Sequence, residues 1–165
     1  MWVELDGWQA KLRFSACHLI PDHPKCGCLH GHTYALSVRV IGAQRGDFVM
    51  DFEDLKQYVA EICAPLDHRV LLASLDSDLQ IENLDTEHIS VVVGKQQKRY
   101  VFPTEDVVLL PINSVSAEDL CSYLLSQLSD KLVTENIKEI HVRVDEGLGQ
   151  GAGCTRYFDS APCSI

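Results

Sequence analysis

A short segment rich in metal-ligand side chains, followed directly by a strand-like pattern, constrains this chain more than any other feature. Residues 26–32 read Cys-Gly-Cys-Leu-His-Gly-His, and residues 33–40 then read as a β-strand. Side chains two positions apart on a strand share a face, so a strand that begins near His30 places His30 and His32 side by side. A third histidine, His18, lies within reach through a fold of the chain. The sequence therefore predicts a metal site.

Length and charge limit the classes of protein to consider. A chain of 165 residues with 46% hydrophobic residues suits one domain, residues 1–165, with an ordinary core. The net charge of −10 argues against non-specific nucleic-acid binding, which needs a basic face. Binding of an anionic small molecule is still compatible with this net charge, because a local pocket can be basic inside an acidic protein.

The first residues do not resemble a targeting signal, because they include Glu4, Asp6 and Lys11 and lack an apolar stretch. The longest apolar runs, such as 107–110, are far shorter than the roughly 18 residues that a membrane span needs. We therefore expect a cytoplasmic protein that binds neither membrane nor nucleic acid. An odd number of scattered cysteines indicates reduced thiols; they lie at positions 17, 26, 28, 63, 121, 154 and 163.

Periodicity and turn residues place the elements of the first half. Asp51 suits a helix N-cap, apolar residues recur after it at helical spacing, and Pro65 ends the pattern. In chain order the sequence predicts a strand ending near residue 18, a loop over 20–25, a strand over 33–41, a turn at 44–47, a short return strand at 48–50, the helix, a loop over 66–71 and an acidic surface over 74–88.

The second half adds strands and one more helix. Ser116 with Asp119 forms a capping-box pattern before an amphipathic segment. The remaining predictions are an extra strand hairpin around 89–103, a short strand over 107–110, a strand over 137–144, a flexible glycine-rich loop over 147–153 and a short strand over 154–158. This order predicts an α+β fold with a mainly antiparallel sheet and two helices packed on one face. Its open sheet edges favour oligomer formation.

Three readings of the histidines compete. Neutral imidazoles suit zinc, and three protein ligands leave a fourth position open, which is typical of a catalytic site. A His-x-His pattern also occurs by chance on strands. Alternatively, Cys26, Cys28, His30 and His32 could form a closed structural zinc site, although side chains this close in sequence converge poorly.

Thiols and one Asp-His pair could supply proton transfer. A thiol near a cation has a lowered pKa and can act as a base, but the residues do not distinguish Cys26 from Cys28, and either could be buried as a small apolar side chain. Asp67 could orient His68 in a proton relay. Adjacent side chains seldom bond to each other, so the pair could equally be a solvated loop.

Two carboxylates near the ends of predicted strands and helices could recognise a guanine or pterin ring. Glu146, at a strand end, can accept two hydrogen bonds from the NH/NH₂ edge of a guanine or pterin. Surface exposure is the simpler reading. Glu118 is explained equally well as a favourable charge near a helix N-terminus.

Together these residues resemble the 6-pyruvoyl-tetrahydropterin synthase / 6-carboxy-tetrahydropterin synthase family. The matching motifs run in order over nearly the whole chain: Phe14-Ser15-Ala16-Cys17-His18, Cys26-x-x-x-His30-Gly31-His32, Asp51-Phe52, Leu66-Asp67-His68, Ser116-x-Glu118 and Glu146. The resemblance implies the tunnelling fold, in which three subunits close their sheets into a barrel and two rings stack as a hexamer. Active sites would then lie between subunits of this homo-oligomer.

The resemblance also implies three groups of site residues. The ligands of a catalytic zinc ion, Zn2+, would be His18, His30 and His32. The proton-transfer residues would be Cys26 as general base, with Asp67 and His68. The pterin-binding residues would be Glu146, supported by Ser116 and Glu118. Cys28 would be only a neighbour of the site.

The implied substrate is a small molecule, 7,8-dihydroneopterin triphosphate. The short spacing from Cys26 to His30 resembles the carboxy branch, which forms 6-carboxy-5,6,7,8-tetrahydropterin with loss of triphosphate and acetaldehyde on the way to queuosine. The pyruvoyl product is the close alternative, and a non-catalytic pterin- or purine-binding module is the alternative of another class. Two departures stand out: Ser114-Val115 replaces the usual Pro-Thr or Asn-Thr pair, and the 74–107 stretch is longer than in small members.

Overall fold

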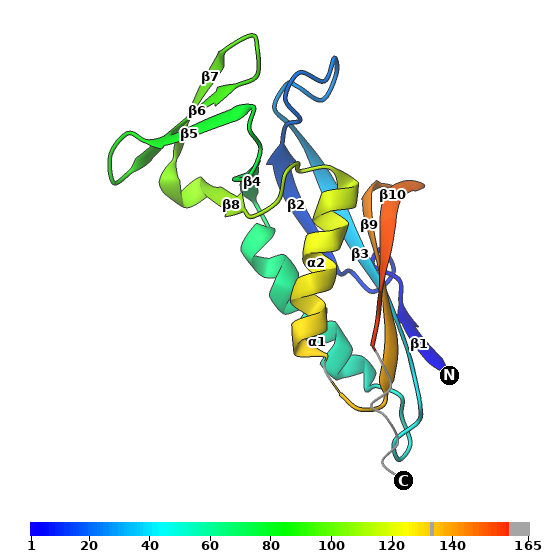
Figure 1. Ribbon diagram of the computed structural model, residues 1–165. Helices are drawn as coiled ribbons and strands as arrows, with labels where there is room; N and C mark the ends of the chain where they lie inside the picture. The colour runs from blue at the N-terminus through cyan, green and yellow to red at the C-terminus, as the bar shows by residue number, and fades with distance from the viewer. Residues whose placement is uncertain (133, 159–165) are drawn as a thin grey trace.

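Most of the strands join one large, curled sheet. The computed structural model describes residues 1–132 and 134–158 (Figure 1). The strands of this sheet are β1 (Trp2–Leu5), β2 (Arg13–His18), β3 (His30–Gly42), β4 (Arg69–Ala73), β8 (Val107–Leu110), β9 (Ile137–Gly147) and β10 (Gln150–Tyr157). Their order is β10-β9-β3-β2-β4-β8, and β1 also pairs with β3. The pairs are antiparallel except that β4 runs parallel to β2 and to β8.

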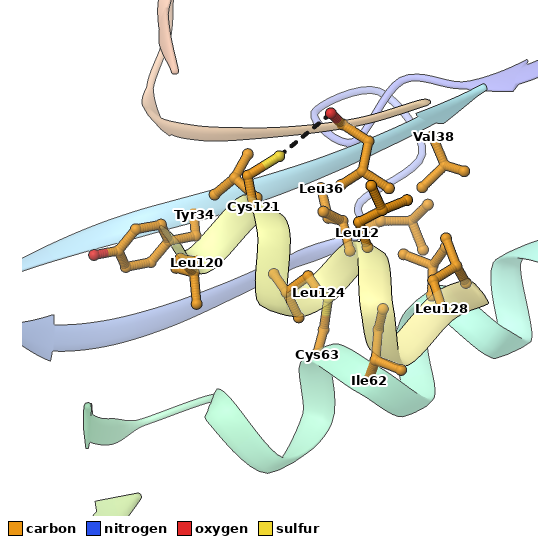
Figure 2. Close-up of a cluster of buried hydrophobic side chains, with 14 of the residues drawn as sticks. Leu12, Tyr34, Leu36, Val38, Ile62, Cys63, Leu120, Cys121, Leu124 and Leu128 are labelled. Atoms are coloured by element: carbon orange, nitrogen blue, oxygen red, sulfur yellow. Dashed lines mark hydrogen bonds between the residues drawn. The ribbon is translucent and has the colours of Figure 1, made fainter. Parts of the chain in front are cut away.

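Two helices, α1 (Phe52–Cys63) and α2 (Ala117–Lys131), lie on the same face of this sheet (Figure 1). Figure 2 shows the apolar side of α2 packed between the sheet and α1, with the Cys121 thiol donating to the Val142 carbonyl. The buried side chains of this layer include Leu55, Val59, Leu120, Leu124 and Leu128. The predicted α+β fold, with two helices on one face of a mainly antiparallel sheet, is confirmed.

Both helices begin at the predicted caps. The Asp51 carboxylate accepts a hydrogen bond from the Glu53 amide, and the Ser116 hydroxyl accepts one from the Asp119 amide. The return bond of the capping box differs from the prediction, because the Asp119 carboxylate accepts from the Ser114 amide. This bond ties the segment before α2 to the first turn of the helix.

Several local predictions were wrong. Of the loop expected over 66–71, only residues 67–68 form a turn; Leu66 ends a short 3₁₀ helix (Ala64–Leu66), and β4 begins at Arg69, with its last three residues buried as is typical of parallel strands. The return strand at 48–50 is reduced to one bridge between Arg45 and Phe48. The glycine-rich loop is mostly strand, since β10 begins at Gln150. A Cβ at Gly151 would collide with the Val144 carbonyl, so glycine permits this close pairing.

A second, three-stranded sheet projects from one end of the large sheet (Figure 1). It contains β5 (Leu79–Asn83), β6 (His88–Val93) and β7 (Lys98–Pro103), in that order. The sequence prediction contained β6 and β7 but treated β5 as acidic surface. A separate apolar cluster joins this sheet to the large one; its buried members are Leu19, Leu72, Val91 and Val93. The small sheet is therefore packed against the end of β2.

Among the described residues, neither helix is long and apolar enough to cross a membrane.

Candidate active site

The pairing of β2 with β3 brings three histidines together. His18 lies opposite His30 in the antiparallel register, and His32 follows on the same face of β3. The ring centroids of the three pairs lie 4.5, 5.1 and 5.0 Å apart. One potential ligand atom from each ring lies within 4.8 Å of the other two. We call His18, His30 and His32 the histidine triad.

Backbone carbonyls fix the tautomers of two triad rings. A carbonyl oxygen can only accept, so His18 Nδ1 must donate to the Val115 oxygen at 2.6 Å, and His30 Nδ1 to the Cys28 oxygen at 2.8 Å. In the neutral form of each ring, the Nε2 atom then carries the lone pair that can bind a metal ion. Metal-binding histidines commonly donate their other ring nitrogen in this way.

The interior position of His18 keeps its ring neutral. The residue is 1% exposed, and burial is the main cause that lowers the pKa of His18 to about 4; nearby His30 and His32 lower it further, against the opposing effect of the Val115 bond. Among the described residues, its buried Nε2 has no hydrogen-bond partner. A buried polar atom without a partner is costly, and a cation would satisfy it. The triad therefore fits a divalent metal ion.

The two cysteines of the loop between β2 and β3 have different surroundings. Cys26 is half-buried; its amide donates to His23 Nδ1 at 2.9 Å and its carbonyl accepts from the Ile20 amide at 2.8 Å. Cys28 is exposed, and its Sγ lies 3.4 Å from Lys98 Nζ. The contribution of Cys28 to the triad is its backbone carbonyl, which the sequence did not indicate.

Asp67 and His68 form a contacting pair at the edge of β2. His68 Nδ1 lies 3.0 Å from Asp67 Oδ2, which is possible because His68 has a left-handed backbone, with φ of 58°. The Ser15 amide donates to Asp67 Oδ1 at 2.7 Å, and the His68 amide donates to the Ser15 carbonyl at 2.6 Å. The Ser15 bond is the main cause that lowers the pKa of the Asp67 carboxyl, and the His68 ring adds to it.

Solvent surrounds this pair on the single chain. The His68 side chain is 81% exposed. Within the described part of the chain, neither Asp67 nor His68 forms a hydrogen bond or ion pair with the triad or Cys26. The bonds from Asp67 and His68 to the Ser15 backbone nevertheless hold this pair against β2, and the second ring nitrogen of His68 has no hydrogen-bond partner among the described residues.

Glu146 and the start of α2 lie next to the triad. Glu146 Oε1, near the end of β9, is 4.0 Å from His18 Nε2, and its side chain is 22% exposed. Val115, which binds His18, is followed directly by Ser116, whose hydroxyl caps the helix. Glu118 is exposed in the first turn of α2. The structure therefore places Glu146 beside His18 and Ser116 directly after the residue that binds His18, with Glu118 two residues further along.

Tyr34 completes the row of rings on this face of β3, and the sequence analysis did not single it out. Its ring lies 5.6 Å from that of His32 and stacks on Phe14 at 4.9 Å. The hydroxyl is buried without a partner among the described residues, and Figure 2 shows it pointing away from the apolar cluster. Burial, followed by the charge of Glu146, raises the pKa of Tyr34. The period-two spacing from His32 was the available signal.

Comparison with known proteins places this site in a family. Residues 9–156 match the sequence profile of the family described as 6-pyruvoyl tetrahydropterin synthase. A putative 6-carboxy-5,6,7,8-tetrahydropterin synthase of Methanocaldococcus jannaschii is 40% identical over 164 residues, which cover 96% of this chain and 99% of that one. A dihydroneopterin monophosphate aldolase of Pyrococcus furiosus is 37% identical over 71 residues, 43% of this chain and 57% of that one.

Solved structures agree with the sequence matches. The 6-pyruvoyl tetrahydropterin synthase of Plasmodium falciparum superposes with a TM-score of 0.88 at 29% identity, and the match covers 96% of this chain and 98% of that one. The curled sheet, its two helices and the histidine triad thus define a tunnelling-fold protein of the pterin-synthase class. The chain belongs to the 6-pyruvoyl tetrahydropterin synthase family. Membership supports a lyase-type tetrahydropterin synthase activity on a small-molecule pterin.

Proposed function

We propose that this protein is a zinc-dependent lyase that converts 7,8-dihydroneopterin triphosphate to 6-carboxy-5,6,7,8-tetrahydropterin, with loss of triphosphate and acetaldehyde, in the route to queuosine and related deazapurines. The observation that carries this proposal is the histidine triad beside Glu146, with the two carbonyl-fixed Nε2 lone pairs of His18 and His30 free to bind an ion. The name of the M. jannaschii relative and the short Cys26-to-His30 spacing favour the carboxy product.

The triad would hold the zinc ion. Three neutral nitrogen ligands with one position left open are typical of catalytic zinc. When bound, zinc would act as a Lewis acid toward the side-chain hydroxyls of the substrate and make the neighbouring C–H bonds more acidic. Val115 and Cys28 contribute through their carbonyls, which hold the His18 and His30 rings in the ligating orientation.

Glu146 would anchor the pterin ring. Its carboxylate can accept two hydrogen bonds from the NH/NH₂ edge of the ring, and charge-assisted bonds of this kind are strong. Because Glu146 Oε1 lies 4.0 Å from His18 Nε2, a ring held there keeps its side chain close to the triad. Ser116 and Glu118, at the start of α2, would support this anchor from the side of Val115.

Cys26 would remove a proton from the substrate side chain. It is half-buried in the loop that leads into His30, whereas the Cys28 thiol lies beside Lys98. A thiolate near a cation is a competent base, because the cation lowers the pKa of the thiol. The bond from the Cys26 amide to His23 holds the backbone of the base in place.

His68 would return a proton to the product, oriented by Asp67. The ionised Asp67 holds the Nδ1–H of His68, which leaves the other ring nitrogen facing solvent. A ring this exposed suits a site that a second copy of the chain completes. The proposed assembly is accordingly a homo-oligomer, a trimer or a dimer of trimers, with active sites between subunits.

Two relatives favour other reactions of the same class of substrate. The P. falciparum neighbour is named for the 6-pyruvoyl product, which forms without side-chain cleavage. The P. furiosus relative is named as an aldolase of dihydroneopterin monophosphate. A non-catalytic pterin- or purine-binding module would bind these compounds without converting them.

A product assay separates these possibilities. The zinc-loaded protein is incubated with dihydroneopterin triphosphate, and separately with the monophosphate, and all products are followed by mass spectrometry. We expect 6-carboxy-tetrahydropterin and acetaldehyde from the triphosphate. A pyruvoyl product without acetaldehyde, or cleavage of the monophosphate alone, would replace the proposal by one of its alternatives. Binding with no product at full zinc occupancy would show a binding module.

A further inference from the structure

The small sheet β5-β6-β7 packs against the loop that carries Cys26. Leu19 and Leu29 lie at the two ends of this loop, and both belong to the apolar cluster that also contains Val91 and Val93 of β6. The loop is therefore attached at both ends to the stretch that is longer than in small members of the family. We call residues 19–29 the Cys26 loop.

Asp22 joins the middle of the Cys26 loop to the turn between β6 and β7. Its Oδ1 accepts a hydrogen bond from the Lys95 amide at 3.1 Å. Asp22 and Gly94, the residue before Lys95, both have left-handed backbones, with φ of 57° and 58°. A Cβ at Gly94 would lie 2.5 Å from Asp22 Oδ1, so the carboxylate fits closely against the turn. Lys98, beside Cys28, makes a second polar contact.

Hydrogen bonds within the loop continue from Asp22 to Cys26. The neighbour of Asp22, His23, accepts from the Cys26 amide at 2.9 Å through its ring. The His23 carbonyl accepts from the Gly27 amide at 3.0 Å, and the Ile20 amide donates to the Cys26 carbonyl at 2.8 Å. A displacement of Asp22 would therefore be transmitted to Cys26 through the backbone on both sides of the thiol.

We propose that Asp22 is a positioning residue, which fixes the Cys26 thiol relative to the histidine triad by holding the Cys26 loop against the β6–β7 turn. The inference rests on the proposed function only in assigning Cys26 the role of base. Small errors in the placement of a reacting group reduce turnover strongly. The extra sheet would thereby serve the site through its contact with the Cys26 loop.

Three variants test this role. Asp22→Ala removes the acceptor, whereas Asp22→Asn keeps a side-chain oxygen and tolerates the left-handed backbone. Asp85→Ala is the matched control. Asp85 caps the loop at the opposite end of the small sheet, where its Oδ1 accepts from the Glu87 and His88 amides at 2.7 Å, away from the Cys26 loop.

Two measurements are made on each full-length, zinc-loaded variant: the rate of Cys26 alkylation by iodoacetamide, from peptide mass spectrometry, and steady-state kinetics. In Asp22→Ala we expect alkylation to rise about fivefold, as for one lost hydrogen bond. We expect kcat to fall about tenfold, with KM and zinc content changed by less than about twofold. Asp22→Asn and Asp85→Ala should stay within about twofold of the unaltered protein in both measurements.

Equal alkylation and equal kcat in Asp22→Ala and Asp85→Ala would overturn the proposal. Alkylation needs no turnover, so a protein inactive on pterins would refute the proposed function and still report on the position of the thiol. If Asp22→Ala does not fold, Gly94→Ala displaces the same carboxylate from the other side of the contact. It should raise alkylation in the same direction, and an unchanged rate would count against the proposal.

Discussion

The histidine triad and the Cys26 loop lie next to each other in sequence but are held by different means. The triad is fixed by the register of two long strands and by carbonyl bonds to His18 and His30. The loop is fixed by its own hydrogen bonds and by the contact of Asp22 with the small sheet. The proposed metal ligands thus depend on the main sheet, whereas the proposed base depends on a surface attachment. Variants in the two regions should therefore fail in different ways.

Removal of a triad ligand should have the largest effect. In His30→Ala we expect zinc to be lost and turnover to fall about 10⁴-fold, since a Lewis acid lowers the activation barrier by several kcal/mol. Metal analysis of the purified protein and the product assay measure both. His88→Ala, at an exposed histidine bonded to Asp85 on the small sheet, is the control and should keep both. Full zinc occupancy in His30→Ala would show that the metal site lies elsewhere.

Removal of the proposed base should separate chemistry from metal binding. In Cys26→Ala we expect turnover to fall about 10³-fold, within the range for a general base, while zinc content stays unchanged. Cys28→Ser is the matched control, because it keeps the carbonyl that binds His30 and should retain most activity. The opposite ranking of these two variants would make Cys28 the base.

Acid should destabilise the metal-free protein through His18. The unfolded ring has its usual pKa near 6.5 and the folded ring about 4, so the unfolded state binds the proton first as pH falls. The stabilisation is present above pH 6.5 and is lost toward pH 4, by about 3 kcal/mol at most. Denaturant unfolding of chelator-treated protein across this range measures it.

A variant that cannot titrate at this position provides the control for that measurement. In His18→Gln the steep decline between pH 6.5 and 4 should be absent, whereas His32→Gln should keep it. An equally steep decline in His18→Gln would assign the pH dependence to other groups.

Asp67→Asn should give the smallest change. Asparagine can still accept the bond from the Ser15 amide, so the loop should keep its position. The charge that orients His68 is lost, and we expect kcat to fall about tenfold, as for other residues that orient a functional histidine. Steady-state kinetics measure this change, and denaturant unfolding of the same variant is the control. A fall in the free energy of unfolding equal to that of Asp67→Ala would indicate a purely structural role.

Local signals in the sequence predicted much of the fold. Asp51 and Ser116 carry side chains that cap helices in any context, and both helices begin there. β4 was not predicted, because a parallel strand buried on both faces lacks the alternation of apolar and polar residues, and Pro65 before it is typical of a loop. The second half of β10 was predicted as a short strand over 154–158, but its first half was not, because its glycines resemble a flexible loop until β9 is placed beside it. These errors arise where distant segments, rather than local preference, decide the structure.

The candidate site shows the same division. The grouping of His30 and His32 follows from strand periodicity, and the opposing position of His18 follows from pairing. The Val115 carbonyl, 97 positions from His18, could not be anticipated from spacing. Nor could the contact of Asp67 with His68, which depends on a left-handed residue that is not glycine. Residue types were predictable, whereas the bonds that orient them required the assembled chain.

The pairing of His18 with His30 across β2 and β3 affects how the loop between them can vary in length. The Cys26 loop begins directly after His18 and ends directly before His30, so an ion bound by both histidines would hold the two ends of the loop together. The entropy of closing a loop changes only slowly with its length. Insertions or deletions between His18 and His30 can therefore move the Cys26 thiol while the two histidines stay opposite each other. On the proposed function, variation in the length of the Cys26 loop changes the position of the base and leaves the proposed metal ligands unchanged.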